Sequence, residues 1–150
     1  MSINIYLQTK IFIACPANVA TGGPELLHQL GFHLINDLGI NAIMNYYNFN
    51  NLKFNSPVHS EYSSYNIPFV LEISKYEDDK NNILIVPEII TSLVLLSKYK
   101  NIRKGVWFLS VDNYYFSRIK KKDFFLQRAI NKFLKLFGKL PIYDISSEEI

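Results

Sequence analysis

Residues 10–47 decide the fold, and their sequence is KIFIACPANVATGGPELLHQLGFHLINDLGINAIMNYY. The run Ile11–Ala14 is continuously apolar and stops at Pro16, a pattern typical of a strand buried on both faces of a parallel sheet. After a loop, leucines recur at helical spacing until Gly39 closes the helix, at positions Leu26, Leu27, Leu30, Leu34 and Leu38. Ala42–Tyr47 is a second strand. The stretch therefore predicts a right-handed crossover that joins two parallel strands.

The rest of the chain continues this alternation. Ile83–Val86 is the clearest central strand, Gly105–Val111 is another, and Pro68–Ile73 is a short one. Glu88–Lys98 has a helical pattern, and residues 48–66 form a long polar loop. We therefore predict one α/β Rossmann-like domain over residues 1–150, with a mostly parallel sheet flanked by helices.

Composition excludes several classes of protein. The chain has 150 residues, of which 49% are apolar and 19% charged, so wholesale disorder is excluded. Cys15 is the only cysteine, which excludes an internal disulfide and a thiolate zinc site. The first ten residues have no secretory signal, and the apolar runs are too short to span a bilayer. A cytoplasmic location is expected.

Charge is concentrated in the last third of the chain. Residues 98–139 hold twelve Lys and Arg against two Asp, a net charge of +10. Within this region, residues 115–138 predict a basic amphipathic helix that ends at Gly138. Its apolar face carries Ile119, Leu126, Ile130, Phe133, Leu134 and Phe137, and its basic face includes Lys120, Lys121, Lys122, Arg128 and Lys132. Two roles are open for this helix. It binds an anionic membrane or a partner protein, or it packs on the sheet and leaves its basic face exposed to solvent. Nucleic acid is not expected, because no aromatic and basic residues interleave.

Polar residues follow three of the predicted strands, in residues 18–25, 87–88 and 110–113. The carboxyl ends of parallel strands open onto one edge, where ligands of α/β sheets bind. In the first loop, Thr21, Gly22 and Gly23 let the backbone approach a ligand near a helix N-terminus. The loop matches neither a P-loop nor a dinucleotide fingerprint, and Glu25 opposes simple phosphate capture. The alternative is a tight turn without a ligand.

Glu88 and Asp112 are the candidate catalytic carboxylates, because partial burial at a strand end can create a general base. Otherwise each caps a helix or pairs with a cation. We call Thr21, Gly22 and Gly23 the glycine loop. His28 lies one helical turn after this loop and is either a ligand contact or a core histidine. His28 and His33 lie about 140° apart on the helix, so they do not share a metal ion, and no metal site is expected.

Several segments in order carry a resemblance: residues 12–18, 21–30, 83–88 and 107–114. Together they resemble the N-terminal half of bacterial glycosyltransferases with the two-domain GT-B architecture, of the surface-polysaccharide type. The resemblance implies a domain that holds the acceptor, while a separate C-terminal domain binds the nucleotide-sugar donor. It also implies no bound metal or cofactor. The implied substrate-binding residues are Thr21, Gly22, Gly23, Glu25, His28 and Asn113.

The implied reaction moves a sugar from a nucleotide-sugar to a surface glycan or lipid-linked acceptor at the inner face of the cytoplasmic membrane. Glu88 or Asp112 would orient or deprotonate the acceptor hydroxyl. The chain stops where the second domain would begin, so it is expected to be a fragment, a split gene product or a degenerate homologue, inactive alone. The alternative from another class is a non-catalytic Rossmann-like module that docks a partner protein or an anionic membrane through its basic helix.

Overall fold

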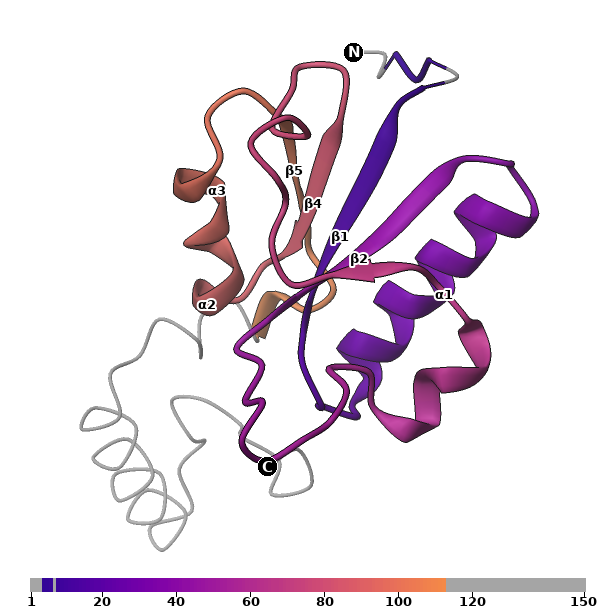
Figure 1. The fold of residues 1–150 in the computed structure, drawn as a ribbon, viewed down its shortest axis with the longest axis vertical. Coiled ribbons are helices and arrows are strands. Elements are labelled where there is room, and N and C mark those ends of the chain that lie inside the picture. The colour runs from indigo at the N-terminus through magenta and orange to yellow at the C-terminus, as the bar shows by residue number, and fades with distance from the viewer. Residues whose placement is uncertain (1–3, 7, 113–150) are drawn as a thin grey trace, which may run out of the picture.

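The computed structural model describes residues 4–6 and 8–112, which form a five-stranded, all-parallel sheet with helices on both faces (Figure 1). The strand order is β3-β2-β1-β4-β5. The strands are β1 (Lys10–Pro16), β2 (Asn41–Tyr47), β3 (Phe69–Val70), β4 (Ile83–Pro87) and β5 (Arg103–Trp107). The predicted α/β architecture with its parallel sheet is confirmed.

The central strand β1 contributes to two apolar cores, one on each face of the sheet. Ile11, Ile13 and Cys15 pack with Leu27 of α1 (Gly22–Asn36) on one face. Phe12 and Ala14, which alternate with them, pack on the other face toward α2 (Ile90–Leu93) and α3 (Leu95–Lys98). This double burial explains why the strand is continuously apolar instead of alternating with polar residues.

Two predicted strands are shorter in the structure. The prediction of a strand to Val111 was wrong, because β5 ends at Trp107 and the next N–H groups bond the Glu88 carboxylate instead of a neighbouring strand. The strand predicted over Pro68–Ile73 is reduced to β3, and the N–H of Ile73 bonds the Tyr99 hydroxyl at 3.1 Å.

The helix predicted over Glu88–Lys98 is two short helices, α2 and α3. The Ser92 hydroxyl donates to the carbonyls of Pro87 and Ile89 (2.5 and 2.7 Å), and such side-chain bonds compete with regular helix formation. The loop 48–66 contains a 3-10 helix, η1 (Ser60–Tyr65), which contacts α1. The predicted helix 115–138 lies outside the described residues.

Candidate functional site

The loops after β1, β4 and β5 meet at one edge of the sheet, around a cavity of about 140 Å³. The cavity lies between β1 and β4, where the crossover after β1 leads to one side of the sheet and the crossover after β4 to the other. Such a switch point leaves a crevice between the two loops. The lining includes Pro16, Thr21, Gly23, Pro24, Pro87, Glu88 and Leu109. Thr21, Gly23 and Glu88, predicted as site residues from separate segments, therefore line one cavity.

Glu88 is the buried carboxylate of this cavity, with a side chain only 1% exposed. Its Oε2 accepts the N–H of Leu109 and its Oε1 accepts the N–H of Ser110, each at 3.0 Å. Hydrogen bonds to a carboxylate are stronger than hydrogen bonds between two neutral groups, so these two bonds hold the loop firmly. Glu88 therefore joins the loop after β5 to the end of β4, and it fixes one wall of the cavity.

The glycine loop forms the opposite wall. Thr21 precedes the first turn of α1 with extended backbone and no side-chain cap, and the Glu25 N–H bonds the Thr21 carbonyl at 3.1 Å. The N–H groups of Gly22 and Gly23 have no partners within the helix, since they belong to its first turn. A Cβ at Gly22 would meet no atom within 4 Å, and one at Gly23 would lie 3.7 Å from Leu109. The loop thus leaves its backbone accessible.

Glu25 is engaged away from this cavity. Its Oε1 accepts a hydrogen bond from Gln29 Nε2 at 3.0 Å and another from the Tyr65 hydroxyl. The bond to Glu25 raises the pKa of Tyr65 above its ordinary value. Glu25 therefore attaches η1 to the start of α1, a role that the sequence did not indicate.

His28 is a buried histidine, 1% exposed, with both ring nitrogens bonded. Its Nδ1 lies 2.6 Å from the Pro24 carbonyl, which can only accept, so Nδ1 carries the proton. Its Nε2 then accepts from the Tyr46 hydroxyl at 2.7 Å. Burial lowers the pKa of His28 and raises that of Tyr46, which favours this neutral pair.

A second cavity of about 220 Å³ lies beyond His28, between α1, η1 and the ends of β2 and β3. The Tyr62 ring stacks on the imidazole with centroids 4.3 Å apart. The half-exposed Phe69 ring stands edge-on to Tyr46. Since the Tyr46 proton is donated to His28, the Tyr46 oxygen offers this cavity acceptor capacity. The carbonyls of Thr21 and Pro24, which line the first cavity, accept hydrogen bonds from Tyr62 and His28, which line the second.

Among the described residues, the predicted site residues Gly22 and Asp112 line neither cavity. Asp112 is exposed, follows β5 at the same edge of the sheet, and is the last described residue. Asn113 and the basic-face residues Lys120, Lys121, Lys122, Arg128 and Lys132 lie outside the described residues.

Sequence reasoning missed three tyrosines that build the site: Tyr46, Tyr62 and Tyr65. Tyr46 was assigned only to a strand, although it is the penultimate residue of that strand and lies near the ligand edge. The other two lie in the polar loop of residues 48–66. Aromatic side chains among its Ser and Asn residues were the available signal that this loop packs against the rest of the domain.

Within residues 4–6 and 8–112, no group of three or more His, Cys, Asp or Glu side chains is arranged to hold a metal ion. None of the helices in that part of the chain is both long enough and apolar enough to cross a membrane. Comparison of the chain with protein-family models, curated proteins and solved structures found no match.

Proposed function

We propose that this chain is the acceptor-side domain of a GT-B-type glycosyltransferase. The observation that carries the proposal is the convergence of the glycine loop and Glu88 on one cavity at the switch point between β1 and β4. The order of the segments that resemble such enzymes supports it as well. The reaction would transfer a sugar from a nucleotide-sugar to a glycan or lipid-linked acceptor.

The two walls of the cavity would have different tasks. The open backbone at Gly22 and the first-turn N–H groups of α1 would face the negative charge of the donor phosphates, which a helix N-terminus stabilises. Glu88 would act mainly by orientation, because both of its oxygens hold backbone N–H groups. Asp112, exposed at the same edge, remains the candidate for accepting the proton of an acceptor hydroxyl.

A non-catalytic Rossmann-like binding module is the second candidate. The observation that favours it is again Glu88, whose two hydrogen bonds give the carboxylate a structural role that needs no substrate. In this reading the cavity is a structural gap, and the basic segment 115–138 makes the functional contact with a partner protein or an anionic membrane.

Titration calorimetry on the full chain separates the two candidates. If most of the donor site belongs to a separate domain, UDP- and GDP-sugars should bind no better than roughly millimolar, about −4 kcal/mol. A glycoside acceptor should bind measurably, and Gly23→Leu, whose side chain would fill the cavity beside Leu109, should abolish the heat of glycoside binding. Micromolar binding of a nucleotide-sugar would contradict the acceptor-side assignment, and no glycoside binding would favour the non-catalytic module.

A further inference from the structure

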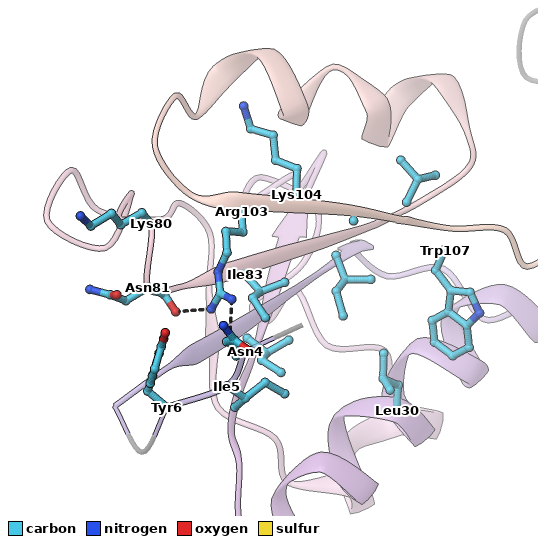
Figure 2. A pocket seen from close by; sticks show the side chains of 14 residues that line it. Asn4, Ile5, Tyr6, Leu30, Lys80, Asn81, Ile83, Arg103, Lys104 and Trp107 are labelled. Carbon is cyan, nitrogen blue, oxygen red and sulfur yellow. Dashed lines mark hydrogen bonds between the residues drawn. The ribbon is translucent and has the colours of Figure 1, made fainter. Parts of the chain in front are cut away.

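Within the described residues, no helix covers the α1 side of β4 and β5, and the N-terminal residues Asn4, Ile5 and Tyr6 lie at one end of this surface. Here the structure has a groove of about 1180 Å³ (Figure 2). Helix α1 contacts β1 and β2, whereas α2 packs against β4 and β1 from the other face. The groove is lined by Ile11, Leu30, Ile83, Ile85, Gly105 and Trp107, and Figure 2 shows Trp107 and Leu30 of α1 at one end. Parallel sheets are normally covered on both faces, so residues 4–6 and 8–112 supply only part of the layer on this face.

Gly105 marks the middle of the groove. It lies in β5 opposite Ile85, and a Cβ there would meet no atom within 4 Å. Glycine weakens a strand by roughly 0.5–1 kcal/mol relative to alanine, and it often marks a place where another chain segment approaches closely. None of the described atoms approaches Gly105 in this way. The residue therefore points to an occupant outside the described part of the chain.

We propose that the segment 115–138 of this same chain packs its apolar face into this groove. The chain leaves β5 at the end of the groove near Trp107, so the segment is already tethered beside it. A helix of these residues would extend about 35 Å, at 1.5 Å per residue. The strands of the groove floor extend only about 17 Å, so one pass along the groove covers them.

Charge favours the same occupant. Lys80 and Arg103 border the opposite, amino-terminal end of the groove and have no carboxylate partner among the described residues. Figure 2 shows the Arg103 guanidinium between Asn81 and Asn4, whose carbonyls accept its hydrogen bonds (2.7 and 2.5 Å). A helix that runs down the groove from β5 is longer than the strands, so it would pass this end and leave residues 140–150 on the amino-terminal side of the sheet. They carry Asp144, Glu148 and Glu149 and no basic residue.

This arrangement is independent of glycosyl transfer, and it redefines the basic segment. In the proposed arrangement the sheet would cover the apolar residues Leu126, Ile130, Phe133 and Leu134, and Lys121, Arg128 and Lys132 on the opposite face would meet solvent. The Phe133 ring would then not be available for insertion into a membrane, and the basic side chains would make any membrane contact of this face largely electrostatic.

Disulfide trapping in the full chain tests the placement. Gly105→Cys is combined with Leu126→Cys, Ile130→Cys, Phe133→Cys or Leu134→Cys, and control pairs use Arg128→Cys or Lys132→Cys on the opposite face. Cys15 stays in place, because burial raises the pKa of its thiol to about 12 and keeps it from exchange. A disulfide requires Cα atoms within about 7 Å. We expect a monomeric cross-linked species at one or more apolar-face positions, forming at least about tenfold faster than with either control.

The other outcomes overturn the proposal. Cross-linked dimers alone would assign the groove to a second copy of the chain. Equal cross-linking at positions of both faces, or no cross-linking at all, would show that the segment does not lie in the groove.

A stability measurement gives an independent answer. With the segment in place, Gly105→Phe must displace it, and the folded-to-unfolded ratio should fall at least about fivefold. With an open groove, the same change removes a strand glycine and should raise that ratio roughly two- to fivefold, which would refute the proposal. Val106→Phe is the matched control, because successive side chains of a strand point to opposite faces, although Val106 also borders the groove.

Discussion

The two hydrogen bonds of Glu88 allow a quantitative prediction. Glu88→Ala leaves the N–H groups of Leu109 and Ser110 without their carboxylate, and each bond to a charged acceptor is worth about 1.5–3 kcal/mol. Both N–H groups belong to half-buried residues, so water replaces part of the loss. We expect the free energy of unfolding to fall by about 2–4 kcal/mol. Glu88→Gln keeps one acceptor oxygen but turns an amide donor toward the other N–H, so its loss should be about 1–2 kcal/mol.

Urea unfolding of the full chain measures both values. Trp107, the only tryptophan, lies two residues before Leu109, so its fluorescence reports directly on this loop. The control is Glu61→Gln, which changes an exposed carboxylate on η1. If Glu88→Gln left both the unfolding midpoint and the Trp107 emission unchanged, Glu88 would not hold the loop, and the wall of the cavity would need another explanation.

Three further predictions concern His28, Cys15 and the basic segment. Because burial lowers the pKa of His28 below its ordinary value of 6.5, the unfolded chain binds the extra proton more readily, and stability should fall as pH decreases below about 6.5. His28→Gln should flatten that fall in urea titrations between pH 7 and 5, whereas His33→Gln, at an exposed site, should not. Cys15 is fully buried, so a thiol reagent should label no thiol in the native protein and one in urea; fast native labelling would contradict the packing of β1. Lys120→Glu/Lys121→Glu/Lys122→Glu should weaken co-sedimentation with anionic liposomes roughly a hundredfold at low salt if the segment binds membranes; equal pelleting of both proteins would exclude an electrostatic membrane role.

The extent to which the sequence predicts this fold depends on the kind of interaction that fixes each element. β1 and β4 are set by burial on both faces, which leaves continuous apolar runs, and both were predicted within a residue or two of their bounds. The end of β5 was not, because it is fixed by a side chain distant in sequence: Glu88 captures the N–H groups that would have extended the strand. The break between α2 and α3 falls at Val94, whose carbonyl accepts both the N–H and the hydroxyl of Ser97.

The candidate site was predictable to the same degree. The topology alone brings Thr21, Gly23 and Glu88 to one edge, since parallel strands place their carboxyl ends together. The role of Glu25 was not predictable, because its partner Tyr65 lies forty residues away in a loop without periodicity. For the same reason the stacking of Tyr62 on His28 is a property of the folded loop and not of any local pattern.

The central claim is that the cavity between β1 and β4 receives a sugar acceptor, and amide chemical-shift mapping tests it most directly. The full chain, labelled with nitrogen-15, is titrated with a short-chain alkyl glycoside below its micelle concentration. The account predicts shifts for the amides of Thr21, Gly23, Leu109 and Ser110, which line the cavity or bond its carboxylate. Shifts confined to the groove around Gly105, or no shifts at all, would contradict it.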